Sequence, residues 1–143
     1  MATAWLPKNQ TSLLIMAGSH AFLASILATI VVTVISVVIG FAYGTFVGPK
    51  LPGSLLTIMT VVSGIPGMVI GAWASHRILS KVYPFVGVKS FASIATAFLV
   101  VGCALDISLD TLELYAQIPR GELAAGMILY VLTFFLTTRH LSR

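Results

Sequence analysis

The chain has 143 residues, of which 58% are hydrophobic and only 8% are charged, and its mean hydropathy is +1.05. This composition lies outside the range of soluble globular domains, so it excludes a soluble enzyme and predicts an integral membrane protein. The formal charge of +4 comes from eight basic and four acidic residues. In so apolar a chain we interpret this excess as a signal of membrane topology, and we expect no nucleic-acid partner.

Long stretches without Asp, Glu, Lys or Arg predict where the chain crosses the membrane. A helix needs about 20 residues to cross a hydrocarbon layer that is about 30 Å thick. The sequence therefore predicts an all-α integral membrane protein whose fold is a four-transmembrane-helix bundle, with residues 1–143 forming a single membrane domain. The predicted spans lie near residues 21–46, 55–75, 86–105 and 121–138.

The first apolar stretch, from Leu13 to Val47, is longer than a single crossing requires. Two arrangements fit it: residues 9–20 lie along the inner interface before the chain enters the bilayer, or the whole stretch forms one long tilted helix. The apolar run is too long for the core of a secretory signal and lacks a small-residue cleavage site. We therefore expect this segment to be retained.

Glycine and proline crowd into residues 48–53, which predicts a tight turn and an antiparallel hairpin of the first two spans. Each of these spans carries small residues at every fourth position, and such residues share one helix face. In lipid, these faces let backbones approach closely enough for van der Waals contacts to hold helices together. The predicted packing interface comprises Ser36, Gly40, Gly44 and Gly48 in the first span and Ser63, Gly67, Gly71 and Ser75 in the second. The two series could pack on each other, or one could face a neighbouring subunit.

Pro66 lies in the middle of the second span, between Gly64 and Gly67. Proline removes one backbone donor and its ring clashes with the carbonyl four residues earlier, so the sequence predicts a hinge or kink at these three residues. Broken helices often line transport sites, which usually carry a charged residue beside the break. Because no charged residue lies near Pro66, we favour a static kink.

The segment between the last two spans contains a predicted helix of its own. Asp110 and Glu113 have the spacing of a capping box, an apolar stripe accompanies them, and Pro119 ends the pattern. We therefore expect a short interfacial helix in this outer loop.

The distribution of Lys and Arg predicts the orientation of the chain. If the chain starts in the cytoplasm, most of its basic residues fall on the cytoplasmic side, which favours cytoplasmic N and C termini in a bacterial inner membrane. The predicted basic rim on that side comprises Arg77, Lys81, Lys89, Arg139 and Arg143. The basic rim could contact anionic lipid headgroups or an acidic partner, although positive-inside placement alone explains it.

No Asp, Glu, Lys or Arg lies in the middle of a predicted span. The predicted spans therefore contain no charged residue that could couple transport to protons or select ions. His20, His76 and His140 fall near predicted cytoplasmic ends, where imidazoles from different helices could converge on a cofactor. Their spacing matches no metal motif, and Cys103 has no neighbouring base. We therefore predict no catalytic residue, no metal site and no cofactor.

The expected function is helix packing. The sequence predicts a non-catalytic accessory or scaffolding subunit that packs on other transmembrane subunits, or on copies of itself, in a larger membrane complex. The lipid bilayer is its other partner. The alternative is a small homo-oligomeric channel or transporter that moves at the hinge in the second span, with Thr57, Thr60 and Ser63 lining the path.

Overall fold

The computed structural model describes residues 10–46, 48, 53–82, 90–109 and 119–143. These residues form four α-helices, which are α1 (Gln10–Phe46), α2 (Gly53–Ser80), α3 (Phe91–Ser108) and α4 (Arg120–Leu141). The described residues contain no strand. The predicted all-α class and the predicted number of helices agree with this arrangement.

The first helix is one continuous element. α1 begins at Gln10 and runs without a break to Phe46, so it starts well before the predicted span at residue 21. Of the two arrangements that fitted the first apolar stretch, the structure has the single long helix. Neither a proline nor a pair of glycines interrupts residues 10–46, and His20 is fully buried among other helices.

The other helices overlap the residue ranges of the predicted spans, but their ends differ. α2 continues past residue 75 to Ser80, and α4 continues past residue 138 to Leu141. α3 begins at Phe91, whereas the predicted span starts near residue 86, and residues 83–89 lie outside the described part of the chain. The predicted interfacial helix also falls outside it, on residues 110–118.

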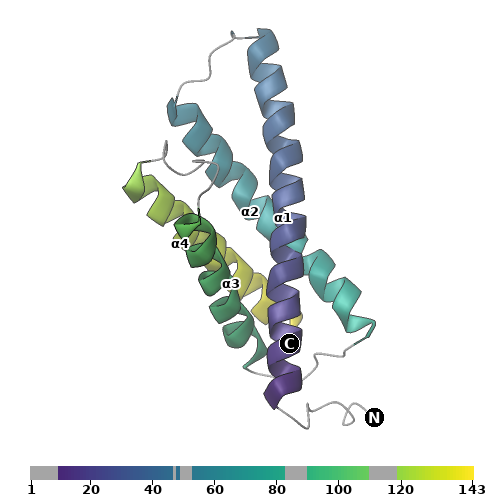
Figure 1. Cartoon of the computed structure of the whole chain (residues 1–143). Coiled ribbons are helices and arrows are strands. Elements are labelled where there is room, and N and C mark those ends of the chain that lie inside the picture. Colours follow the sequence, from purple (N-terminus) through teal and green to yellow (C-terminus); the bar gives the residue numbers. More distant parts are fainter. Residues whose placement is uncertain (1–9, 47, 49–52, 83–89, 110–118) are drawn as a thin grey trace.

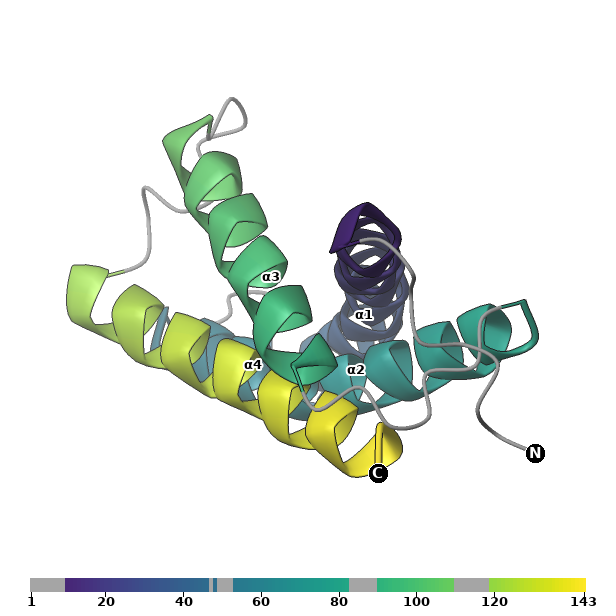
Figure 2. The ribbon, with the colours of Figure 1, turned by 90° about the horizontal axis from the view of Figure 1, so that it is seen from below.

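The helices form a ring in which α1 packs on α2, α2 on α4, α4 on α3, and α3 on α1. Figure 2 shows this arrangement from below, with α1 seen nearly along its axis. α1 and α2 cross and then diverge, and the C-terminal end of α1 reaches beyond the other three helices (Figure 1). The ring is therefore closed over one part of α1 and open over the other.

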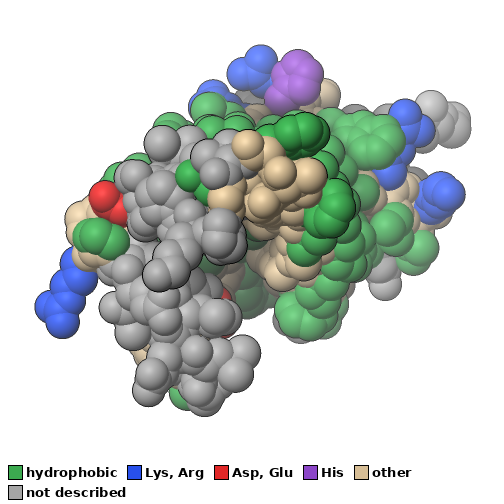
Figure 3. All heavy atoms as spheres, turned by 90° about the horizontal axis from the view of Figure 1, so that it is seen from above, with side chains coloured by type: hydrophobic (Ala, Val, Ile, Leu, Met, Phe, Trp, Pro, Cys, Tyr) green, Lys and Arg blue, Asp and Glu red, His purple; other side chains and the backbone are tan. Residues whose placement is uncertain are grey.

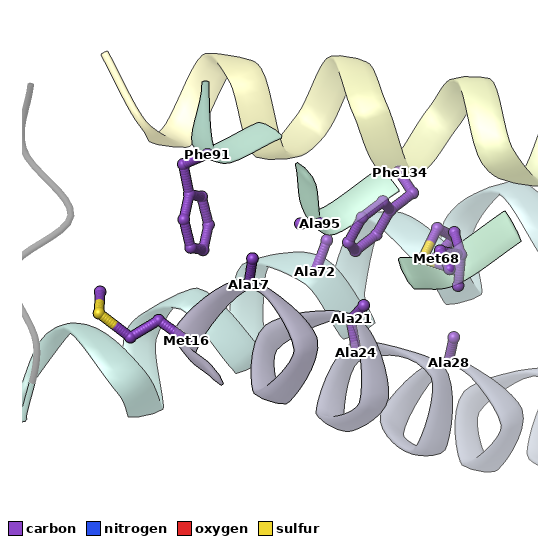
Figure 4. Packing of buried hydrophobic residues seen from close by; sticks show 11 residues of the cluster. Met16, Ala17, Ala21, Ala24, Ala28, Met68, Ala72, Phe91, Ala95 and Phe134 are labelled. Carbon is purple, nitrogen blue, oxygen red and sulfur yellow. The ribbon is translucent and has the colours of Figure 1, made fainter. Parts of the chain in front are cut away.

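The core lies where all four helices meet, and small residues of α1 make it possible. Ala17, Ala21, Ala24 and Ala28 are buried, and their spacing of four, three and four residues places them on one face of α1. Their side chains point from α1 toward the other helices (Figure 4). Around them pack the larger buried residues Met68, Phe91, Leu99 and Phe134. Because alanine is short, the neighbouring helices approach α1 closely and larger side chains fill the remaining space.

The outside of the molecule is apolar. Phe22 is 69% exposed, Phe41 76% and Phe46 86%, and exposed Val, Ile and Leu side chains occur on every helix. On the face seen from above in Figure 3, hydrophobic side chains cover much of the described surface, with Lys and Arg at its edge. Over their described residues, α1, α3 and α4 are long and apolar enough to cross a membrane.

Candidate functional site

The predicted small-residue series of α2 faces α1. A β-carbon on Gly71 would lie 2.5 Å from the Ala24 carbonyl oxygen and 2.8 Å from the Ala28 nitrogen. A β-carbon on Gly67 would lie 2.7 Å from Cγ2 of Val32 and 3.1 Å from the Ala28 carbonyl oxygen. A side chain at Gly71 would require a shift of the backbone, and one at Gly67 would require Val32 to move. At these two glycines, therefore, the α2 backbone lies directly against α1.

The corresponding series of α1 lies elsewhere. Among the described residues, nothing lies within 4 Å of a β-carbon placed on Gly40, Gly44 or Gly48, and Ser36 is half-buried. Gly40, Gly44 and Gly48 therefore do not face Gly67 and Gly71, which lie against Ala24, Ala28 and Val32 of α1. Gly48 has a separate role at the helix end, since its φ of +149° favours glycine and its N–H donates to the Tyr43 carbonyl at 3.3 Å.

The predicted hinge residues have different surroundings. α2 is helical throughout, including at Pro66, whose side chain is exposed. A β-carbon on Gly64 would meet nothing within 4 Å among the described residues, whereas Gly67 lies against α1. Gly67 thus belongs to the α1–α2 contact, and movement at this point stays a prediction.

A polar cluster connects the four helices near the other end of α1. His20 of α1 is fully buried, and its Nδ1 lies 2.8 Å from Oγ of Ser75 on α2. Its Nε2 lies 3.0 Å from Oγ1 of Thr138 on α4. The imidazole ring also packs against Phe91 of α3, with ring centroids 5.5 Å apart, and against Phe134 of α4, at 5.3 Å. We call these five residues the His20 cluster.

The hydrogen bonds of the His20 cluster define where its protons lie. Ser75 Oγ donates to the backbone carbonyl of His20 at 3.1 Å, because a carbonyl can only accept. The single hydroxyl proton is then used, so Nδ1 of His20 must donate to Ser75 Oγ. In the neutral imidazole Nε2 is therefore the acceptor, and it receives the hydroxyl proton of Thr138. The tautomer with a proton on Nδ1 satisfies every polar atom of the imidazole.

The hydroxyls of the His20 cluster bridge helices, whereas several hydroxyls outside it return to their own helix. Thr29, Thr33, Thr96 and Thr133 each donate to the carbonyl four residues earlier, at 2.7–2.9 Å. Such bonds satisfy the side chain but do not join helices. At His20, in contrast, hydroxyls of α2 and α4 both turn toward a side chain of α1. The polar contacts here fix the mutual positions of three helices.

The three histidines do not share one site. His76 lies beside His20, with ring centroids 6.4 Å apart, but His140 is exposed at the end of α4. In the described part of the chain, no group of three His, Cys, Asp or Glu side chains could hold a metal ion. Both nitrogens of His20 are already engaged with hydroxyls, so a ligand could bind them only by replacing a hydrogen bond.

The predicted basic rim is exposed where it is described. Arg77 lies in the last turn of α2, and Lys81 directly follows that helix. Arg139 lies in the last turn of α4, Arg143 lies two residues beyond its end, and Lys89 is outside the described residues. The Arg77 guanidinium carbon lies 5.2 Å from the centre of the Trp73 ring, and that of Arg139 lies 6.0 Å from the Phe135 ring. Each arginine thus makes a cation–π contact with an aromatic ring one turn earlier in its helix.

The sequence analysis did not predict the His20 cluster. It placed His20 at the membrane boundary, and it interpreted Ser75 only as a small packing residue. A sequence signal for the burial of His20 does exist. Ala17, Ala21, Ala24 and Ala28 repeat along the buried face of α1, and His20 lies beside that face. Thr138 carries no such signal, because its partner lies on a helix distant in sequence.

Comparison with protein-family models, with curated proteins and with solved structures found no match to the chain. The function must therefore be inferred from the structure itself. Its three main features are the His20 cluster, the tight α1–α2 contact at Gly67 and Gly71, and the open glycine face in the C-terminal part of α1.

Proposed function

We propose that the chain is a non-catalytic membrane protein, an accessory or scaffolding subunit that packs on transmembrane helices of other subunits in a bacterial inner membrane. The observation that carries this proposal is the open glycine face of α1. Gly40 and Gly44 have no atom of the described residues within 4 Å of where a β-carbon would lie. In lipid, helix faces of this kind associate by close backbone contact.

Insertion into the membrane is supported by the exposed surface. Valine and phenylalanine side chains surround the open glycine face of α1: Val34, Val37, Val38 and Phe41 are 57–76% exposed. Water disfavours a patch of this composition, whereas lipid or another apolar helix does not. We propose that α2 is the fourth span, with both termini in the cytoplasm.

A role without coupling chemistry is supported by the positions of the acidic residues. Asp106 lies in the last turn of α3, and Glu122 lies in the first turn of α4. Both are exposed, so the described interior holds no carboxylate. The polar groups that are buried there, His20, Ser63, Ser75 and Thr138, are neutral or can be neutral. These residues serve packing and helix registration.

The test compares two exposed positions on the same part of α1. Gly44→Leu blocks the open glycine face, whereas Ala42→Leu adds comparable bulk on a different face, about 200° away around the helix. The chain is purified from its native membrane in mild detergent, and the partner subunits and their ratio are measured by native mass spectrometry. We expect Gly44→Leu to lose a stoichiometric partner that both wild type and Ala42→Leu retain.

Two outcomes would contradict this function. If wild type, Ala42→Leu and Gly44→Leu all purify as the same lone chain, no partner uses the open face. If the wild type forms a homo-oligomer that conducts a solute in liposomes, the alternative of a small channel or transporter is correct. In that case Gly67→Ala and Pro66→Ala would separate the contact at Gly67 from bending at the hinge.

A further inference from the structure

The described surface contains a hollow at the C-terminal end of α2. Trp73, Arg77, Ile78 and Lys81 line it, and its volume is about 270 Å³. Trp73 and Arg77 are four residues apart and share one face of α2, and Lys81 follows directly after the helix ends at Ser80. All four side chains are exposed. The hollow is therefore accessible from outside the helix bundle.

Two basic residues, Arg77 and Lys81, form the positive side of the hollow, and Arg77 is held in place by Trp73. The Arg77 guanidinium lies over the Trp73 ring, at 5.2 Å from its centre, and this contact restrains a side chain that is otherwise flexible. The guanidinium carries five N–H groups that can donate to an anion. Lys81 adds a second cation one turn later. The two positive groups can meet one anion between them.

The described Asp and Glu side chains lie far from these cations. Asp106 and Glu122 lie at the linked ends of α3 and α4. The hollow lies at the opposite end of the bundle. Ser75, close to the hollow on α2, contacts His20, and His20 also contacts Phe91 at the start of α3 and Thr138 near the end of α4. The positive charge of the hollow is thus not neutralised by the acidic residues that the structure describes.

The other side of the hollow is apolar. Trp73 and Ile78 are 48% and 49% exposed, and they lie next to the two cations on the same helix end. A tryptophan beside basic residues at the end of an apolar helix is typical of the level of the lipid headgroups. A soluble acidic peptide would leave the tryptophan and isoleucine without an apolar partner. A lipid supplies both an anionic group and hydrocarbon.

We propose that this hollow is a binding site for an anionic phospholipid. The phosphodiester group pairs with the Arg77 guanidinium and the Lys81 ammonium, and the glycerol and upper acyl chain lie against Trp73 and Ile78. This proposal depends on the membrane insertion proposed above, but it does not depend on the packing of other subunits against α1.

The test measures lipid binding to the full chain. Phosphatidylglycerol or phosphatidylcholine is titrated into the detergent-purified protein, and native mass spectrometry counts the bound lipids. We expect the wild type to bind phosphatidylglycerol in preference to phosphatidylcholine. The double variant Arg77→Gln, Lys81→Gln should bind phosphatidylglycerol about 30-fold more weakly, because each basic residue near an anionic lipid contributes about a fivefold change in affinity.

The matched control removes the same charge from another helix. Arg139 and Arg143 have the same spacing, and Arg139 also packs over an aromatic ring. Arg139→Gln, Arg143→Gln should leave binding of phosphatidylglycerol unchanged. Trp73→Leu keeps the apolar side but removes the ring below Arg77, so it should weaken binding several-fold. Circular dichroism of each variant verifies that the helices remain folded.

Three results would overturn the lipid site: equal binding of the two lipids by the wild type, no loss in the Arg77, Lys81 double variant, or an equal loss in the control pair. Extraction of membranes with alkaline carbonate separates this failure from failure of the proposed function. A chain that stays in the membrane but shows any of the three results lacks only the lipid site. A chain that alkaline carbonate releases is not inserted, and both proposals then fail.

Discussion

The two parts of α1 carry similar apolar sequences but have opposite surroundings. The first part presents Ala17, Ala21, Ala24 and Ala28 to the other helices, together with His20, and these five side chains are buried. The second part presents Gly40 and Gly44, and among the described residues nothing lies within 4 Å of where their β-carbons would be. Small residues therefore permit close packing, but they do not by themselves bring a partner. In the first part, the hydrogen bonds of His20 to Ser75 and Thr138 also join α1 to α2 and α4.

The largest expected effect is that of Gly71→Leu. A β-carbon at this position already lies 2.5 Å from a backbone oxygen of α1, so a leucine forces the two helices apart. We expect a loss of at least about 3 kcal/mol in the free energy of unfolding, or no stable bundle. Thermal unfolding in detergent, followed by circular dichroism, measures this loss.

Gly44→Leu is the matched control for this comparison, since it makes the same substitution on the open face of the same hairpin. Its unfolding temperature should equal that of the wild type. Equal destabilisation by the two substitutions would show that the open face is covered within the chain, and the contrast between the two parts of α1 would be lost.

The next largest effect is expected for His20→Ala. This change leaves a cavity between four helices and removes the hydrogen-bond partner of Ser75 and Thr138. We expect a loss of about 2–4 kcal/mol in the free energy of unfolding, from the cavity and from the Thr138 hydroxyl, which loses its acceptor. Chemical unfolding of the purified chain by a denaturing detergent measures it. His140→Ala removes an exposed ring and should change stability little; a similar loss in this control would mean that the method does not report on the cluster.

The smallest expected effect is that of Thr138→Val, which keeps the shape of the side chain but removes the donor to Nε2 of His20. We expect a loss of about 1 kcal/mol in the free energy of unfolding, in the range found for hydrogen bonds between membrane helices. Thr133→Val is the control, because Thr133 donates to the Leu129 carbonyl of its own helix. The same unfolding experiment applied to both variants resolves the difference, and a greater loss in Thr133→Val would contradict the bridging role of Thr138.

The proton positions of His20 can be measured separately. Nitrogen NMR of the labelled imidazole should show a protonated Nδ1 and an unprotonated Nε2, because Ser75 uses its only proton on the His20 carbonyl. In Thr138→Val, the Nε2 signal should shift while the Nδ1 signal is retained. A proton on Nε2 in the neutral wild-type ring would show that Ser75 does not donate to the carbonyl.

Some of the candidate site follows from local pattern. The spacing of Gly67 and Gly71 indicated a close helix contact, and both glycines do lie against α1. The same rule applied to Gly40 and Gly44 identified a face that the chain itself leaves open. Spacing describes only one surface of a contact, so it could not identify the partner surface. That surface turned out to be the alanine face of α1, and the interface role of the open glycines stays a prediction.

The amino-acid sequence alone determined the helical class, the four long helices of the described residues and the apolar character of the outside, because these follow from composition and from the lengths of uncharged stretches. Only the tertiary structure decided that His20 would be buried between Ser75 and Thr138, since their hydrogen bonds join residues 55 and 118 positions apart. It also decided which part of α1 would be covered. Contacts between distant segments depend on how helices of unequal length cross, and no local periodicity encodes that crossing.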